Sequence, residues 1–332
     1  MPSKAPLMKN SCPPQADRIG LSLPAADDSC ATPLSRVSGS KRAIKRKRLL
    51  ALTAAFAFSI TTTLFAATSI NATNQYTYGA NMGWMNWRGD TNNGAVIGEF
   101  VCSGYIYAAN VGWINLGSGF PGDRVHYQNN SATDFGVNHD GEGNLRGYAW
   151  GANIGWIKFE DSGAPTVDLK TGNLTGHAYS ANCGWISLSN AFATVRTDTI
   201  PAGFDFDGDG IPDPWELTYT NSVAVFNAST DSDGDGVLDK DEYLADTSPT
   251  DPNDNLRILS ITRGAPTPTY TILLWTSKAT RCYAVQDRHA LDLGSSWADY
   301  FVAPFLGANN AGFDESDNQH FYRIRAFRPL AP

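Results

Sequence analysis

The segment "GYAWGANIGWIKF", residues 147–159, is one of four related segments in a chain of 332 residues. The others are "YTYGANMGWMNW" from Tyr76, "GYIYAANVGWINL" from Gly104 and "GHAYSANCGWISL" from Gly176. Each places Ala-Asn-x-Gly-Trp between two short alternating runs, which indicates strand, tight turn and strand. Because a unit of this size cannot bury an apolar face alone, the copies are expected to stack or to share one sheet.

The alternation within each copy divides its residues between two faces. Ile157 and Phe159 share one side of their strand and are expected in the core, whereas Trp156 and Lys158 share the other. The matched asparagines are expected to satisfy the turns and to form a hydrogen-bonded ladder between copies; they are Asn81, Asn110, Asn153 and Asn182. Periodicity leaves open whether the domain is a solenoid-like stack or one twisted antiparallel sheet. We expect residues 117–130 to form an inserted loop between the second and third copies.

The aromatic residues of the repeats allow two interpretations. The simpler expectation is that they pack one copy on the next and so build a scaffold. The alternative is a row that stacks on the sugar rings of a glycan, with Tyr107, Trp150 and Tyr179 as candidate ligand-binding residues. Exposure of these three side chains favours glycan binding, and burial favours the scaffold.

Two acidic segments carry the clearest chemical signal, "DFDGDGIPDPWE" at residues 205–216 and "DSDGDGVLDKDE" at residues 231–242. Both have Asp at positions 1, 3 and 5, Gly at 6 and Glu at 12, which is the pattern of a calcium-binding loop. Calcium takes six to eight oxygen ligands, and this spacing directs carboxylates towards one point. The expected ligands are Asp205, Asp207, Asp209, the carbonyl of Ile211, Asp213 and Glu216, and then Asp231, Asp233, Asp235, the carbonyl of Val237, Asp239 and Glu242.

Each loop is expected to open a short helix, and no amphipathic helix precedes either loop. The stretches "DGDGIPDPWE" and "DSDGDGVLDKDEYLADTSPTDP" resemble the thrombospondin type 3 and dockerin calcium-binding repeats over about 50 residues. The resemblance implies a calcium-ordered segment rather than a pair of full EF-hands. The alternative is an acidic linker that binds nothing, although like charges this close repel one another unless a cation lies among them.

A basic run, "KRAIKRKR" at residues 41–48, precedes an apolar run at residues 49–67, which is typical of a secretory signal peptide. A membrane anchor is the alternative. Cleavage between Ala66 and Ala72 is expected to leave no membrane span and to place the protein outside the cell or on its surface. Residues 73–332 hold 15 Lys and Arg and 30 Asp and Glu, a net charge of −15 that argues against a nucleic-acid partner.

Cysteine and catalytic signals are sparse. Of the three cysteines after residue 72, Cys102 and Cys183 are the candidates for a disulfide, and Cys282 is left over. The sequence has no Gly-x-Ser-x-Gly or His-Glu-x-x-His motif, and its histidines are dispersed at positions 126, 139, 177, 289 and 320. The chain is therefore not expected to be an enzyme; a hydrolase with two carboxyl groups facing each other across a cleft is the alternative.

These observations predict an all-β protein in four parts. A leader and signal peptide occupies residues 1–72, a Trp-repeat β domain residues 73–197, a calcium-binding connector with two short helices residues 198–255, and a small β-sandwich residues 256–330. The expected function is that of a secreted or cell-surface calcium-binding structural or adhesion-type protein. Its expected partners are calcium and a cell-surface glycan or matrix, with carbohydrate binding through the aromatic row as the alternative function.

Overall fold

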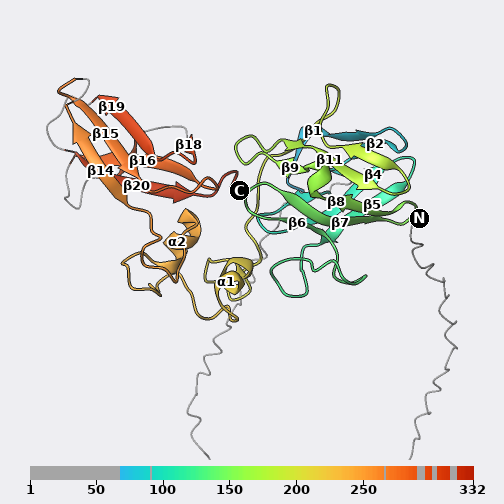
Figure 1. Cartoon of the computed structure of the whole chain (residues 1–332), viewed down its shortest axis with the longest axis horizontal. Coiled ribbons are helices and arrows are strands. Elements are labelled where there is room, and N and C mark those ends of the chain that lie inside the picture. The colour runs from blue at the N-terminus through green and yellow to red at the C-terminus, as the bar shows by residue number, and fades with distance from the viewer. Residues whose placement is uncertain (1–67, 90–91, 265–266, 290–295, 301–304, 315–319) are drawn as a thin grey trace, which may run out of the picture. The chain divides into compact units, whose positions relative to one another are not determined.

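The chain is an all-β protein with two short α-helices, as the sequence predicts (Figure 1). The computed structural model describes residues 68–89, 92–264, 267–289, 296–300, 305–314 and 320–332. The predicted leader and most of the predicted signal peptide, residues 1–67, lie outside the described residues.

The four repeat copies form four antiparallel hairpins. These are β1 (Ile70–Gly79) with β2 (Gly83–Asn86), β4 (Cys102–Ala108) with β5 (Gly112–Ser118), β7 (Leu145–Gly151) with β8 (Gly155–Phe159), and β11 (His177–Ser180) with β12 (Gly184–Ser187). Each hairpin pairs with the next, and β12 pairs with β1, Tyr78 opposite Ser187. The sheet therefore closes on itself as a barrel of eight strands. Of the two predicted arrangements the antiparallel sheet is the observed one, and its closure was not predicted.

Short strands extend this barrel. Strand β3 (Val96–Ile97) pairs with β4, β6 (Val137–His139) pairs with β7, and β13 (Val195–Thr197) pairs with β1. A separate hairpin consists of β9 (Thr166–Val167) and β10 (Leu174–Thr175), and a 3-10 turn, η1, spans Asp161–Gly163. The long interval between the second and third copies holds a loop, as expected.

Alternation along the strands fills the barrel with aliphatic side chains. Ile106, Ile114 and Ile157 are less than 5% exposed, and Phe159 packs in the same cluster. Trp156 is 43% exposed on the opposite face. The predicted core face is confirmed, because side chains at every second position point into the closed sheet.

The Ala-Asn-x-Gly turns are joined in a ring by their asparagines. The Nδ2 of Asn110 donates to the carbonyl of Met82 at 3.1 Å, in the turn of the preceding copy. The other three bonds repeat this contact: Asn153 to Val111 at 3.0 Å, Asn182 to Ile154 at 2.9 Å, and Asn81 to Cys183 at 3.1 Å. The expected ladder is therefore a closed circle, since the first copy bonds to the fourth.

The glycine of each turn has a positive φ, and in the first turn it also permits a close contact. Gly83 has φ +80°, a left-handed conformation that suits glycine. A Cβ at Gly83 would lie 2.9 Å from the Nδ2 of Asn110, so a side chain there would displace the asparagine of the next copy.

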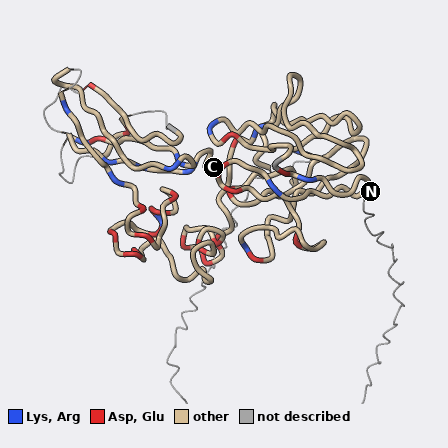
Figure 2. The backbone as a smooth tube through the Cα atoms, in the orientation of Figure 1, with Lys and Arg blue, Asp and Glu red and all other residues tan. Residues whose placement is uncertain are grey.

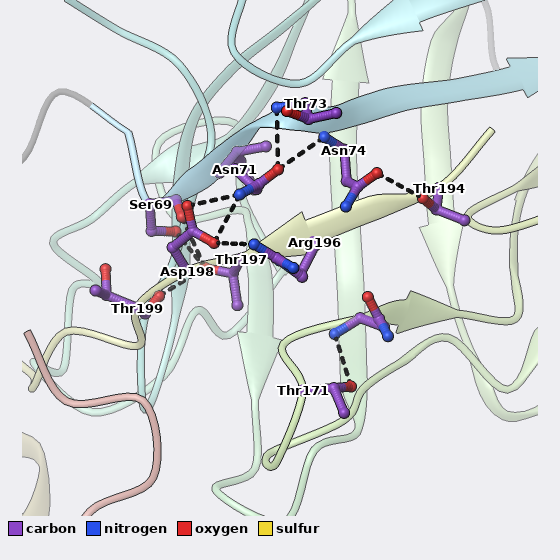
Figure 3. A network of polar contacts seen from close by, with 12 residues as sticks. Ser69, Asn71, Thr73, Asn74, Thr171, Thr194, Arg196, Thr197, Asp198 and Thr199 are labelled. Atoms are coloured by element: carbon purple, nitrogen blue, oxygen red, sulfur yellow. Dashed lines mark hydrogen bonds and ion pairs between the residues drawn. The ribbon is translucent and has the colours of Figure 1, made fainter.

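The first strand begins at Ile70, ahead of the predicted domain boundary at residue 73. Ser69 is buried, and its hydroxyl accepts a hydrogen bond from Thr197 at 2.8 Å. Asn71 donates to both carboxylate oxygens of Asp198, each at 2.9 Å (Figure 3). Residues 69–72 thus belong to the barrel because they bind β13 and the residues after it.

The C-terminal part consists of two sheets packed face to face, the predicted sandwich. One sheet has the order β14 (Ile258–Arg263), β15 (Tyr270–Trp275), β19 (Asn310–Asp314). In the other, β16 (Cys282–Arg288) pairs with β17 (Ala298–Asp299), β18 (Phe305–Leu306) and β20 (Phe321–Phe327). Leu273, Tyr283 and Phe313 pack together in the core between the sheets.

The proposed Cys102–Cys183 disulfide is absent, and both thiols are free and buried. Cys102 is the first residue of β4, at one end of the barrel. Cys183 lies in a turn at the other end, where β4 finishes with Ala108. Six residues of extended strand amount to roughly 20 Å, well beyond the reach of a disulfide.

Replacing Asn182 by Ala is expected to remove one bond of the turn ring and to lower the free energy of unfolding by about 1 kcal/mol. The midpoint of thermal unfolding, followed by near-ultraviolet circular dichroism of the tryptophans, should fall by roughly 2–4 °C. Asn130→Ala, at an exposed asparagine of the inserted loop, is the control. Equal midpoints for the two variants would contradict a stabilising role of the ring.

Candidate metal centre

The acidic segments lie around two seven-residue helices, α1 (Asp213–Tyr219) and α2 (Asp239–Ala245). Figure 2 shows acidic residues gathered along this stretch of the chain. Residues 205–254 carry 14 acidic residues and one basic residue, Lys240. Each helix begins at the ninth position of its loop, and no helix enters either loop among the described residues, as the sequence predicts.

The first loop is folded by its own carboxylates. Asp205 Oδ1 accepts from the amide of Gly208 at 2.7 Å, and its Oδ2 accepts from that of Gly210 at 2.9 Å. Asp209 Oδ1 accepts from the amide of Ile211 at 2.9 Å. Gly210, at position 6, has φ +92°, which gives the sharp turn that the pattern requires. The loop therefore makes the sharp turn at position 6 that the sequence pattern predicts.

The second loop repeats these bonds at equivalent positions. Asp231 Oδ1 accepts from Gly234 at 2.8 Å and Oδ2 from Gly236 at 2.9 Å, and Asp235 Oδ1 accepts from Val237 at 2.7 Å. Gly236 has φ +95°. Two segments of different sequence thus fold alike, because the aspartates and glycines occupy the same positions in both.

The predicted carboxylates come together in each loop. In the first loop, carboxylate oxygens of three residues lie within 4.8 Å of one another: Asp205, Asp207 and Asp209. In the second loop the same holds for Asp231, Asp233 and Asp235. Three converging carboxylates suit a hard cation such as calcium. The roles of the Ile211 and Val237 carbonyls remain a prediction.

The two glutamates at position 12 are the strongest indication of a cation. Glu216 and Glu242 are each 0% exposed, and neither oxygen of either carboxyl has a hydrogen-bond partner. Leaving a buried carboxyl unpartnered is costly, whereas a bound cation would satisfy both oxygens. These residues therefore fit a divalent ion held between the glutamate and the aspartates of each loop.

Burial, followed by the nearby charge of Asp209, raises the pKa of Glu216 to about 8. Burial, followed by the nearby charge of Asp233, raises the pKa of Glu242 to about 8 as well. The folded protein without a cation disfavours the ionised form of each group. Its stability is therefore expected to fall as pH rises from about 4.5 towards 8, and a bound cation would reverse this by favouring the carboxylates.

The aspartates at position 9 hold the loops in shape. Asp213 Oδ1 accepts from the amide of Phe206 at 2.8 Å. Asp239 Oδ1 accepts from the amide of Ser232 at 2.9 Å, and its Oδ2 accepts from the Ser232 hydroxyl at 3.0 Å and from Thr230. Asp213 Oδ2 is buried and has no hydrogen-bond partner. The roles of Asp213 and Asp239 as metal ligands stay predictions.

The two loops share one small apolar core. Ile211 of the first loop is 0% exposed and packs with Trp215 of α1, Phe226, and Tyr243 of α2. The rings of Trp215 and Tyr243 are 5.7 Å apart between centroids. The two helices and the first loop therefore pack together as one unit.

A buried ionic cluster, which the sequence did not predict, joins α2 to both β domains. Glu99, after β3, is 6% exposed and accepts from the Tyr243 hydroxyl at 2.8 Å. Arg281 Nη2 lies 3.1 Å from Glu99 Oε1, and Arg328 Nε lies 2.9 Å from Oε2. These residues are far apart in sequence and belong to no motif, so no sequence signal could have grouped them.

The inserted loop of the barrel also contacts the first acidic loop. The guanidinium of Arg124 lies 5.5 Å from the ring centroid of Phe206, and its Nη1 is 3.7 Å from Asp213 Oδ2. The rings of Phe120 and Phe204 pack edge to face at 5.1 Å. The barrel therefore packs directly on residues that position the first candidate metal site.

The candidate ligand-binding aromatics lie on the outside of the barrel. Tyr107 is 40% exposed, and Trp150 and Tyr179 are each 37% exposed. They belong to a group of eight aromatic residues, the aromatic belt, in which each hairpin contributes one cross-strand pair: Tyr78–Trp84, Tyr107–Trp113, Trp150–Trp156 and Tyr179–Trp185. Aliphatic side chains fill the interior, and the belt aromatics contact one another in pairs within each hairpin on the outer face.

Two open cavities adjoin the belt. One of about 520 Å³ lies beside Trp84 and Tyr76 and is completed by residues 190–194. The other, of about 440 Å³, lies beside Trp156 and Tyr148 and is lined by Asn129, Asn130 and Ser131 of the inserted loop. Both combine exposed aromatic rings with amide and hydroxyl groups.

Comparison with known proteins returned no matching family model, no matching curated protein and no matching solved structure. None of the helices among the described residues is long and apolar enough to cross a membrane. The fold and the candidate site thus define the chain only as an all-β protein with two acidic loops at a two-helix connector.

Replacing Glu242 by Gln is expected to have opposite effects with and without calcium. Without the ion, at pH 8, the variant should unfold at a higher temperature than the wild type, because a buried unpartnered charge is removed. With calcium, its second site should bind more than about tenfold more weakly, since ligand charge sets affinity. Calorimetry and thermal melts measure the two effects, and Asp241→Asn, at an exposed acidic residue outside the ligand set, is the control.

Proposed function

We propose that this chain is a secreted or cell-surface structural or adhesion-type protein in which calcium orders the connector between a β-barrel and a β-sandwich. The observation that carries the proposal is the pair of buried glutamates whose four carboxyl oxygens lack a partner. In each loop three aspartates converge on one point, and their charges act on the glutamate of that loop. The basic and apolar runs at residues 41–67 support export from the cell. Free calcium is plentiful outside the cell.

Calcium would act on the connector through the packing of its two loops. An ion in either loop neutralises its carboxylates and fixes the first turn of α1 or α2. Both helices contribute to the shared apolar core, and α2 also donates to Glu99. Order in the loops would therefore favour the contacts that the connector makes with both β domains. The absence of entering helices argues against a sensor that opens a groove.

Calcium titration by calorimetry, with limited proteolysis alongside, tests this proposal. We expect two sites per chain, and protection of residues 196–256 that is lost on adding a chelator. Asp209→Ala and Asp235→Ala should each abolish one site and increase cleavage within the connector in the presence of calcium. A connector that resists protease equally in the wild type, in both variants and with chelator would refute the proposal.

A second function, binding of a surface glycan, is favoured by the exposure of the aromatic belt. Exposed aromatic rings stack on sugar rings, and the amide and hydroxyl groups of the adjoining cavities suit sugar hydroxyls. The cavities flank Trp84 and Trp156, which belong to the first and third hairpins. The belt would then be the adhesive surface, and the calcium connector would link it to the sandwich.

Affinity electrophoresis in gels that contain soluble polysaccharides tests glycan binding. We expect retardation by at least one polysaccharide, and Trp156→Ala should weaken it by about tenfold, as for other aromatic anchors. Trp113→Ala removes a belt residue that lines neither cavity and should have a smaller effect. Unretarded migration in every gel, or equal loss in the two variants, would count against binding at these cavities.

A further inference from the structure

The edge of the C-terminal sandwich brings together three side chains of types that can ligate a metal ion and that are dispersed in the sequence. Strands β16 and β20 pair in antiparallel register, with Asp287 opposite Tyr322 and Arg288 opposite Phe321. His289 directly follows β16, and His320 directly precedes β20. Because side chains alternate between faces, Asp287, His289 and His320 all lie on one face at the end of the ladder.

The ligand atoms of these residues converge. His320 Nδ1 lies 3.3 Å from Asp287 Oδ2, and His289 Nε2 lies 3.9 Å from the same oxygen. One candidate ligand atom from each of the three residues lies within 4.8 Å of the other two, and the two imidazole rings are 4.6 Å apart between centroids. Ligand atoms around a tetrahedral zinc ion are about 3.4 Å apart, so a modest rotation of His289 would complete the arrangement.

Two of the ligands are held in place by the sandwich. The side chains of Asp287 and His320 are 11% and 7% exposed, and the His320 ring stacks on Tyr322 at an interplanar angle of 8°. Tyr322 in turn packs on Phe313 in the core. The side chain of His289 is 63% exposed, so the site opens to solvent on that side. A fixed pair with one exposed ligand allows an ion to enter and leaves coordination positions for water.

Two cationic side chains of these strands, Arg288 and Arg323, are directed to the other face of the ladder. Arg288 and Arg323 both lie over the ring of Trp297, with guanidinium carbons 5.6 Å and 4.7 Å from its centroid. Their charges are therefore not placed among the three ligands. Imidazole nitrogen is a poor ligand for calcium but suits zinc and similar first-row ions, so this site differs in kind from the two acidic loops.

We propose that Asp287, His289 and His320 form a binding site for a divalent transition-metal ion of the zinc class at the edge of the sandwich. The site is independent of the calcium connector, since it shares no residue with either loop. A zinc ion there would join the ends of β16 and β20 on the face that carries Tyr322.

Zinc titration of the purified protein tests this site, in calcium excess so that the acidic loops are occupied. Calorimetry should show one zinc ion per chain, and zinc should raise the melting temperature of the sandwich. His289→Ala, at an exposed side chain, should weaken zinc binding at least tenfold. His177→Ala, at an exposed histidine of the barrel, should leave it unchanged.

A substitution that retains a metal ligand separates coordination from structural damage. His289→Cys supplies a thiolate, which is a good zinc ligand, and should bind zinc within about tenfold of the wild type. Absence of zinc binding to the wild type, or equal affinity of the wild type and His289→Ala, would overturn the proposal. Equal loss in His289→Ala and His289→Cys would also overturn it.

Discussion

Closure of the repeat sheet is the constraint on which the rest of the barrel depends. The pairing of β12 with β1 supplies partners for strands that would otherwise end the sheet, and the asparagine of each turn bonds to the turn before it. A closed sheet has an inside and an outside, so alternation in every strand becomes a division between core and surface. The belt aromatics are exposed because closure assigns the aliphatic positions to the interior.

Two buried carboxyl groups are the main constraint on the connector, as closure of the sheet is on the barrel. Glu216 and Glu242 end their loops within the first turns of two helices that share an apolar core. Placing an unpartnered carboxyl at 0% exposure opposes folding, so these residues fit the fold best with a cation beside them. In the proposed function, ion binding would be coupled to the packing of the connector, and α2 contacts Glu99 through Tyr243.

Local patterns predicted what depends on neighbouring residues. Alternation gave the hairpins and the core face, and the spacing of Asp and Gly gave the two loops and their exiting helices. The hydrogen bonds that Asp239 accepts from Thr230 and Ser232 were not part of the pattern. Pattern matching also treated His289 and His320 as dispersed, because their proximity follows from strand register, which sequence spacing does not reveal.

The sequence by itself determined the all-β class, the four hairpins and the two acidic loops, since each depends on residues within about a dozen positions of one another. Only the tertiary structure decided that the hairpins form a ring, that the belt is exposed, and that Glu99 meets Arg281 and Arg328. It also brought Asp287 to the two histidines. These features arise from contacts between distant segments, and folding selects such contacts by burial and register rather than by any local signal.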